Sequence, residues 1–162
     1  MKSGRVWKFR DDIDTDQIIA SQYLIYPNIE EMKKYAFESL DSCFAKNVIE
    51  NDIIVAGQNF GCGSSREQAP RVLKALGIYA VVAQSFGRIF YRNAINIGLP
   101  VILCESIQND IKQGEVITVN FDAGEIIAGE KQYNCTKLPE HMQKIINKGG
   151  LIEFLNSDEA EF

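Results

Sequence analysis

The chain has 162 residues, of which 46% are hydrophobic and 24% are charged. This length and balance are typical of one globular domain with a sizeable core. A net charge of −5 and a pI near 5.0 argue against nucleic acid or an anionic membrane as the partner. No apolar run approaches the roughly twenty residues of a membrane span, and no signal peptide precedes Lys2. We therefore expect one cytoplasmic domain over residues 1–162, with a mobile acidic tail over about 157–162.

The first twenty residues predict a strand followed by an acidic turn. Residues 4–9 alternate as a half-buried strand does. The aspartates that follow lack the glycine and terminal glutamate of an EF-hand, so a calcium loop is not indicated; they are Asp11, Asp12, Asp14 and Asp16. Turn formation and helix capping explain most of them, which leaves one acid to reach a functional site.

An aromatic segment and two short helices come next. Residues 21–28 are apolar and aromatic without a helical period, and Tyr26 precedes a proline and so favours an extended backbone. A packed surface loop is the simplest interpretation. Asn28 is expected to cap a helix over 29–35, and a second short helix is expected over 37–46.

The strongest functional signal lies between Gly57 and Gln68. It follows an apolar run at 52–56 that predicts a buried strand, and it leads into a helical stripe over 66–76. Glycine lets the backbone approach a ligand closely, a helix start offers unpaired N–H groups to an anion, and arginine can bind a carboxylate or phosphate through two nitrogens. The residues that could do this are Gly57, Gly61, Gly63, Ser64, Ser65 and Arg66. The pattern therefore predicts an anion site that also offers a hydroxyl as nucleophile or base.

A purely structural interpretation competes with this one. Ser64-x-x-Glu67 and Ser65-x-x-Gln68 both fit the capping box, whose purpose is only to start a helix. Capping explains neither the glycines nor an arginine where an acid would suit the helix dipole better. Nucleotide-binding motifs are absent, because there is no Gly-x-x-x-x-Gly-Lys-Ser/Thr run and no third glycine after Gly61-x-Gly63. The spacing indicates an anion-binding site and leaves the identity of the anion open.

The second half of the chain predicts an α/β part and a β part. A strand over 78–83, a helix over 85–96 and a strand over 101–103 call for a parallel sheet with crossover helices. Three alternating segments with hairpin spacers predict an antiparallel meander that forms a barrel-like layer beside that sheet; they are residues 115–121, 125–128 and 131–135. A helix over 139–148 and a last turn over 151–155 follow.

Several single residues carry expectations of their own. Pro70 should kink its helix or tighten the first turn. Arg88 and Arg92 share a helical face with large apolar neighbours, so both are expected to be buried and ion-paired with Glu67 or with one of the early aspartates. His141, the only histidine, is expected at the surface. The four cysteines lack metal-ligand spacing, so we expect free thiols and no metal bound by this chain; they are Cys43, Cys62, Cys104 and Cys135.

Three motifs, in this order along the chain, resemble those of one family. They are Asp14-Thr15-Asp16-Gln17-Ile18-Ile19, Gly61-Cys62-Gly63-Ser64-Ser65-Arg66-Glu67 and Phe86-x-Arg88-Ile89-Phe90-x-Arg92-Asn93. Together they resemble the small subunit of 3-isopropylmalate dehydratase, which is the separate-chain form of the swivelling domain of the aconitase superfamily. The resemblance spans Gly4 to about Leu155 and implies an α/β fold of the swivelling β/β/α type.

The resemblance implies that this chain is half of a hydro-lyase of leucine biosynthesis. The partner would be a large subunit that carries a [4Fe–4S] cluster, whereas this chain would bind no cofactor. The complex would isomerise a small dicarboxylate, 2-isopropylmalate, to 3-isopropylmalate by dehydration and rehydration. Ser64 would remove the proton next to a carboxylate. Gly63, Ser65 and Arg66 would bind the substrate. Asp16 and Arg88 would contact these residues and support them without touching the substrate.

The same resemblance places residues 21–28 opposite the variable group of the substrate. Ile25 stands where homoaconitase-like chains carry an arginine that holds an extra carboxylate. Tyr23, Leu24 and Tyr26 extend the apolar surface and bring no positive charge. These four residues are the predicted specificity determinants.

Two alternatives stay open on the sequence alone. Homoaconitase and other 2-alkylmalate hydro-lyases share the three motifs. A stand-alone module that binds a small anion, needs no partner and performs no chemistry would also account for the anion site. The choice between Ser64 and Ser65 as the base is open as well, and so is a homo-oligomer of the isolated chain.

Overall fold

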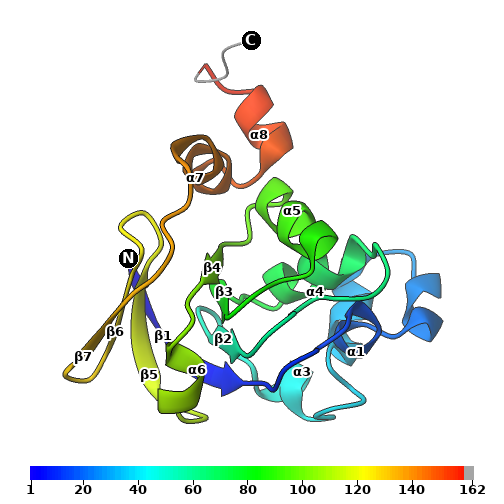
Figure 1. Cartoon of the computed structure of the whole chain (residues 1–162). Helices are drawn as coiled ribbons and strands as arrows, with labels where there is room; N and C mark the ends of the chain where they lie inside the picture. Colours follow the sequence, from blue (N-terminus) through cyan, green and yellow to red (C-terminus); the bar gives the residue numbers. More distant parts are fainter. Residues whose placement is uncertain (159–162) are drawn as a thin grey trace.

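Seven strands form one curled mixed sheet in the computed structural model, which describes residues 1–158 (Figure 1). Their order across the sheet is β4-β3-β2-β1-β5-β6-β7. The bounds are β1 Lys2–Lys8, β2 Ile53–Ala56, β3 Ala80–Ala83, β4 Val101–Leu103, β5 Val116–Asn120, β6 Glu125–Ala128 and β7 Lys131–Asn134. The expected acidic tail lies outside the described residues from 159 on.

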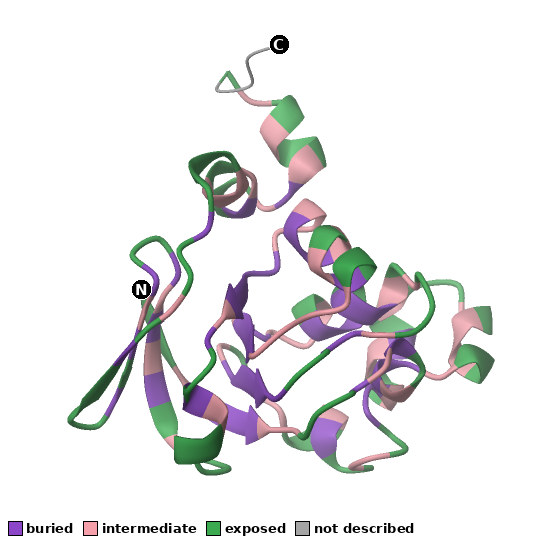
Figure 2. Cartoon of the chain, viewed as in Figure 1, coloured by how far each residue is buried: buried purple, intermediate pink, exposed green. Residues whose placement is uncertain are grey.

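β1 joins the two halves of the sheet. It pairs in parallel with β2, with Val6 opposite Ile53, and antiparallel with β5, with Gly4 opposite Ile117. β2, β3 and β4 continue in parallel, which confirms the predicted crossover pattern. Every residue of β2 and β3 is buried, as expected for parallel strands that are covered on both faces (Figure 2).

The meander is continuous with the parallel sheet and is not a separate layer beside it. β5, β6 and β7 follow one another as antiparallel neighbours, as predicted. Past β7, the N–H of Thr136 donates to the carbonyl oxygen of Leu103 in β4 (2.9 Å), so the curl brings the two ends of the sheet together. The expected barrel-like character therefore comes from the curl of a single sheet.

The longer helices and the last turn over 151–155 lie where the sequence predicted them, and the helix expected over 29–35 is divided into an α-helical turn and a 3-10 turn. Figure 1 shows α1 to α5 gathered beside the parallel half, with α7 and α8 above it. The α-helices are α1 Thr15–Ile18, α2 Ile29–Met32, α3 Phe44–Asn47, α4 Gln68–Ala75, α5 Arg88–Asn96, α6 Ile107–Asp110, α7 Glu140–Asn147 and α8 Leu151–Leu155, and two 3-10 turns are η1 Ser21–Ile25 and η2 Lys33–Tyr35. Each described helix is too short or too polar to cross a membrane.

One local expectation was wrong, and one of two alternatives for Pro70 is removed. The helix predicted over 37–46 shrinks to α3, because Phe37 takes a left-handed backbone conformation (φ 57°) that interrupts a right-handed helix. For Pro70 the sequence allowed a kink or a tightened first turn, and the structure places the proline in the first turn of α4, which begins at Gln68, so no interior kink arises. The N–H that proline lacks has no partner within the helix at that position anyway.

Candidate functional site

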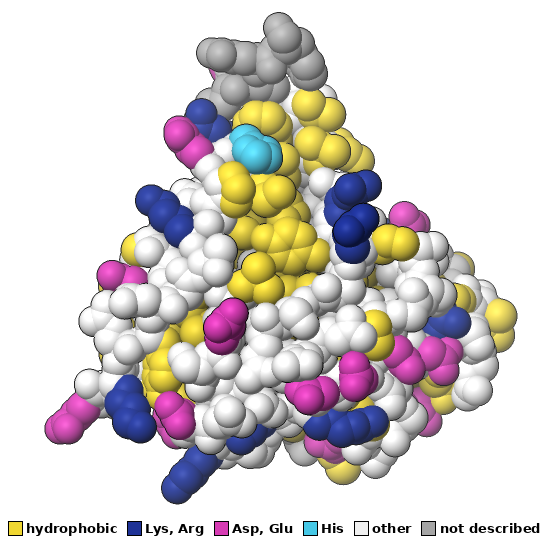
Figure 3. All heavy atoms as spheres, in the orientation of Figure 1, with side chains coloured by type: hydrophobic (Ala, Val, Ile, Leu, Met, Phe, Trp, Pro, Cys, Tyr) yellow, Lys and Arg dark blue, Asp and Glu magenta, His cyan; other side chains and the backbone are white. Residues whose placement is uncertain are grey.

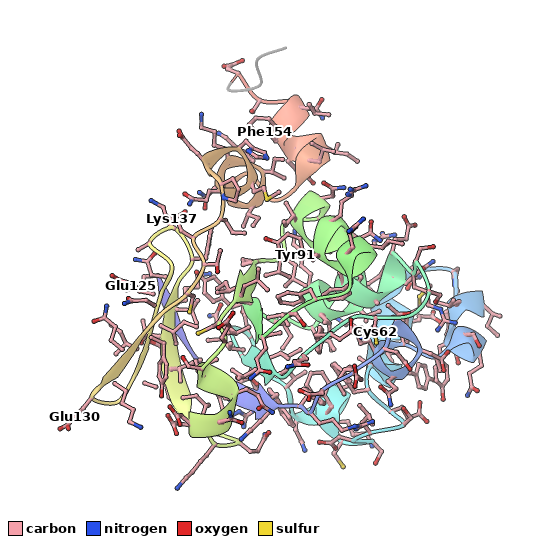
Figure 4. The ribbon with its side chains drawn as sticks, viewed as in Figure 1. Cys62, Tyr91, Glu125, Glu130, Lys137 and Phe154 are labelled. Carbon is pink, nitrogen blue, oxygen red and sulfur yellow. The ribbon has the colours of Figure 1, made fainter. Side chains whose placement is uncertain are left out.

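The glycine-rich loop is anchored to the segment that leads into α1. The N–H of Gly61 donates to the carbonyl oxygen of Ile13 (2.7 Å), and the N–H of Thr15 donates to that of Cys62 (2.8 Å). Figure 4 shows Cys62 beside α1 accordingly. These two bonds bring the first and second sequence motifs together although nearly fifty residues separate them.

Ser64 lies at the surface of this loop and contacts a buried threonine. The Thr15 hydroxyl oxygen is 3.1 Å from the Ser64 carbonyl oxygen, to which it can donate, and 3.2 Å from the Ser64 hydroxyl oxygen. Thr15 is 2% exposed, so its hydroxyl is a fixed neighbour of an exposed serine. Sequence reasoning missed Thr15 as an individual residue, although it sits inside the Asp14-Thr15-Asp16 motif that could have identified it.

The capping interpretation of the two serines is wrong. The N-cap of α4 is Glu67, which makes no side-chain capping bond, and neither Ser64 nor Ser65 reaches the helix. Among residues 1–158, the backbone N–H groups of Gly63, Ser64 and Ser65 find no acceptor. Three consecutive unpaired N–H groups on an exposed loop can bind an anion, which is the property that the sequence predicted for this stretch.

Arg66 ties the serine loop to the segment between α1 and η1. Its Nη1 donates to Asp16 Oδ1 (2.7 Å) and to the Ile19 carbonyl oxygen (2.9 Å). The arginine side chain is only 18% exposed, whereas Asp16 is 64% exposed. The hydrogen bond from Arg66 lowers the pKa of Asp16, which keeps that carboxylate ionised. The acid predicted to support the site thus contacts the arginine predicted to bind substrate.

The remaining aspartates serve the backbone, as expected of turn and capping residues. Asp14 caps α1 by accepting from the N–H of Gln17 (2.7 Å). Asp11 accepts from the N–H of Gln58 (2.7 Å), and Asp12 accepts from the Asn59 side-chain amide (3.2 Å).

Glycine is required at different positions of the motif for different reasons. A Cβ on Gly57 would lie 1.7 Å from Asp11 Oδ1, and one on Gly61 would lie 2.2 Å from Phe90 Cγ, so packing within the chain requires both. Gly63 is exposed and has φ +98°, with no atom within 3.4 Å of a Cβ placed there. Of these three glycines, only Gly63 leaves space in which a ligand could approach the backbone.

Three of the four predicted specificity residues lie in the short 3-10 turn η1, and Tyr26 follows it, whereas we expected an irregular packed loop. Ile25 ends η1 and is 84% exposed. Leu24 is half-buried, and Tyr23 and Tyr26 stack with Tyr35, their rings within 9° of parallel. Asp16 Oδ1 also accepts from the N–H of Ser21 (3.4 Å), so one carboxylate contacts both Arg66 and the start of this turn.

Arg88 and Arg92 do not lie as predicted. Both are exposed on α5, and within the described residues neither makes an ion pair with Glu67 or with an aspartate. The apolar neighbours turn inward instead, with Phe90 2% exposed and Phe86 half-buried. Arg88 nevertheless starts α5 next to the loop, because the preceding Gly87 donates its N–H to Phe60 (2.8 Å).

The histidine and three of the four cysteines lie outside the glycine-rich loop, whereas Cys62 is part of it. His141 is exposed on α7, and Figure 3 shows it on the surface among apolar side chains. The four cysteines are free thiols, as expected. Among residues 1–158 no group of three or more His, Cys, Asp or Glu side chains is placed to hold a metal ion.

The curled mixed sheet and the exposed serine loop define an α/β domain with a candidate anion site. Comparison with known proteins shows the family to which this domain belongs. The aconitase C-terminal domain family matches residues 13–106. An isopropylmalate/citramalate isomerase small subunit of Methanocaldococcus jannaschii is 48% identical over 98% of this chain and 95% of that protein. A 3-isopropylmalate dehydratase small subunit of Archaeoglobus fulgidus is 51% identical over 95% of this chain and 96% of that protein.

A solved structure agrees with these relatives. The crystal structure of a 3-isopropylmalate dehydratase from Methanocaldococcus jannaschii superposes with a TM-score of 0.89 at 44% identity, covering 94% of this chain and 92% of that one. The chain therefore belongs to the aconitase C-terminal domain family and, within it, to the small subunits of 3-isopropylmalate dehydratase.

Proposed function

We propose that this chain supplies the proton-transfer and carboxylate-binding half of a hydro-lyase that converts 2-isopropylmalate to 3-isopropylmalate. Ser64 takes the proton from the carbon next to a substrate carboxylate. Arg66, the Ser65 hydroxyl and the N–H groups of residues 63–65 hold that carboxylate. The observation that carries the proposal is the loop itself, which presents an exposed serine and three consecutive unpaired N–H groups. The Arg66 guanidinium, two residues after Ser64, is held by Asp16 and the Ile19 carbonyl oxygen.

A serine hydroxyl is a weak acid, so the loop has to stabilise its anion. Unpaired backbone N–H groups and a nearby guanidinium favour negative charge, most of all when water is excluded. Thr15 adds a hydroxyl at 3.2 Å from the Ser64 oxygen and can donate to it once the proton has left. In the isolated chain this loop faces solvent, because Gly63, Ser64 and Ser65 are all exposed. A second surface has to cover the loop to give a dry site, which supports a large-subunit partner.

The partner is also the expected source of the metal centre. Iron–sulfur clusters are held by cysteine thiolates in close spacing, and the described part of this chain brings no such group together. A [4Fe–4S] cluster on the large subunit would act as a Lewis acid on the leaving hydroxyl. The residues of this chain then bind, orient and deprotonate the substrate.

The exposed Ile25 favours an alkyl substrate over a tricarboxylate. A carboxylate placed against this side chain without a cation would go unpaired, at a cost of several kcal/mol. The name of the Methanocaldococcus jannaschii relative includes citramalate, whose alkyl group is a methyl. An apolar tip accepts either alkyl group, so we propose 2-isopropylmalate as the substrate and citramalate as the second candidate.

The test is co-expression with the large subunit, followed by anaerobic assay of the purified complex. Ser64→Ala should lower kcat by about 10²- to 10⁴-fold, the usual loss for a general base, while the melting temperature changes little because Ser64 does not cap α4. Ser65→Ala is the matched control and should mainly raise KM. Near-normal turnover by the Ser64→Ala complex would remove Ser64 from the chemistry. Full activity of the chain alone would defeat the two-subunit proposal.

A further inference from the structure

The turn that carries Ile25 has few backbone constraints of its own. Within η1 and its cap, the N–H of Tyr23 donates to Ala20 (3.1 Å) and that of Tyr26 donates to Tyr23 (3.3 Å), and both bonds are local. The turn lies in the blue segment at the right edge of Figure 1. Something other than main-chain pairing has to fix the direction in which its exposed tip points.

Tyr35, in the neighbouring turn η2, contacts the residues on both sides of Ile25. Its ring centroid lies 4.1 Å from that of Tyr23, with an interplanar angle of 4°, and 5.4 Å from that of Tyr26, with an angle of 5°. The Tyr26 hydroxyl donates to the Tyr35 hydroxyl (3.2 Å). Ile25, between the two stacked tyrosines in sequence, has no such contact and is 84% exposed.

We propose that Tyr35 is a positioning residue that sets alkyl-group selectivity by holding Tyr23 and Tyr26, and through them Ile25, in place. Stacked rings give a defined geometry as well as attraction. A tip held at both flanks presents a fixed apolar surface, whereas a loose tip would fit isopropyl and methyl groups less selectively. The inference rests on the proposed function, since it needs Ile25 to face the substrate.

The experiment uses the two-subunit complex with Tyr35→Leu, Tyr35→Phe, Ile25→Ala and the Tyr35→Leu/Ile25→Ala double variant. Leucine keeps apolar volume but cannot stack, and phenylalanine keeps the stack but removes the hydroxyl that Tyr26 contacts. Selectivity is the ratio of kcat/KM for 2-isopropylmalate to that for citramalate. A second readout is amide hydrogen exchange of residues 21–26, with β4 as the internal reference, because local opening speeds exchange only where contacts are lost.

Tyr35→Leu should lower the selectivity ratio about tenfold, within the range that small alkyl differences produce, and should speed exchange at residues 21–26 alone. Tyr35→Phe should stay close to the parent protein in both readouts. The double variant should be no less selective than Ile25→Ala, because Tyr35 acts through Ile25.

Two outcomes overturn the inference, and they are distinguishable. If Ile25→Ala changes the ratio while Tyr35→Leu changes neither the ratio nor exchange, the role of Tyr35 is refuted and the proposed function stands. If Ile25→Ala leaves the ratio unchanged, Ile25 does not face the alkyl group, and that part of the proposed function fails together with the role of Tyr35.

Discussion

At the scale of single residues, the site depends on a few side chains that hold the serine loop against the first motif. Thr15 is the least exposed of them, and both hydrogen bonds of its side chain go to Ser64. Arg66 is held by Asp16 and by the Ile19 carbonyl oxygen. None of these contacts can be read from the spacing of the motifs, because each one joins residues about fifty positions apart.

Replacing Thr15 by valine tests its contact with Ser64. Valine keeps the shape and deletes the hydroxyl, so kcat should fall by about two- to tenfold, the equivalent of one net hydrogen bond, with little change in KM. Steady-state kinetics of the complex measure this. Thr15→Ser, which restores the hydroxyl, should recover most of the rate, and an equal loss in both variants would indicate a packing effect.

Replacing Asp16 by asparagine tests the support of Arg66. Arg66 keeps its hydrogen bond to the Ile19 carbonyl oxygen but loses its ionised partner. KM should therefore rise several-fold, about what one charge-assisted hydrogen bond contributes, while kcat changes less. The pKa of Asp16 is lowered, so the pairing is complete above the ordinary aspartate range and is lost only as pH falls through the lowered value. The rise in KM should therefore be equal at pH 6 and pH 8; an effect confined to one of them would contradict an ionised Asp16.

At the scale of elements, the glycine loop is shaped by its contact with α5. Gly61 has φ +80°, and a Cβ there would lie 2.2 Å from Phe90, a buried residue of α5. Gly114 has φ +85° but no neighbour within 4 Å of a Cβ, so the two glycines share backbone strain and differ only in packing.

Alanine at these two positions separates strain from packing. Gly114→Ala should cost about 1 kcal/mol of unfolding free energy, from the left-handed backbone alone. Gly61→Ala should cost roughly 2–4 kcal/mol, because overpacking adds to the same strain. Urea unfolding of both variants measures the difference. Equal losses would mean that Phe90 moves aside without cost.

At the scale of the whole molecule, one buried aspartate connects β1, the strand shared by both halves of the sheet, to the chain entering β2. Asp52 is 1% exposed, and its Oδ2 accepts from Trp7 Nε1 (2.8 Å), the Ile49 N–H (2.9 Å) and Arg5 Nη2 (3.0 Å). Three donors on one oxygen satisfy the buried charge, as burial of a carboxylate requires.

Removal of that carboxylate should weaken the entire fold. Asp52→Ala leaves the buried Trp7 Nε1 and the partly buried Ile49 N–H without their acceptor and removes the ionised partner of Arg5, so the free energy of unfolding should fall by about 3–5 kcal/mol. Trp7, the only tryptophan, reports the transition by fluorescence. Glu140→Ala, which breaks an exposed pair with Lys144 on α7, is the control and should cost only about 0.3–0.5 kcal/mol. A small loss for Asp52→Ala would show that the cluster is not structural.

The sequence by itself determined the strands, the longer helices, the meander and the family, because apolar periodicity and short motifs are local and survive without knowledge of contacts. It also predicted an anion site at the serine loop, since hydroxyls, glycine and arginine stand together in the chain. The exposure of Arg88 and Arg92 could not be predicted, because the face of α5 that turns inward depends on the packing of Phe90 against Gly61.

Only the tertiary structure decided that the two serines do not cap α4, that Thr15 lies against Ser64, and that Asp16 joins Arg66 to the start of η1. It also placed Tyr35 against Tyr23 and Tyr26, a stack that no periodicity encodes. The contacts of Thr15 and Asp16 join segments about fifty residues apart, and sequence spacing carries no information about which distant segments the fold brings together. The serine loop and the tyrosine stack depend instead on local backbone geometry that the residue pattern does not encode.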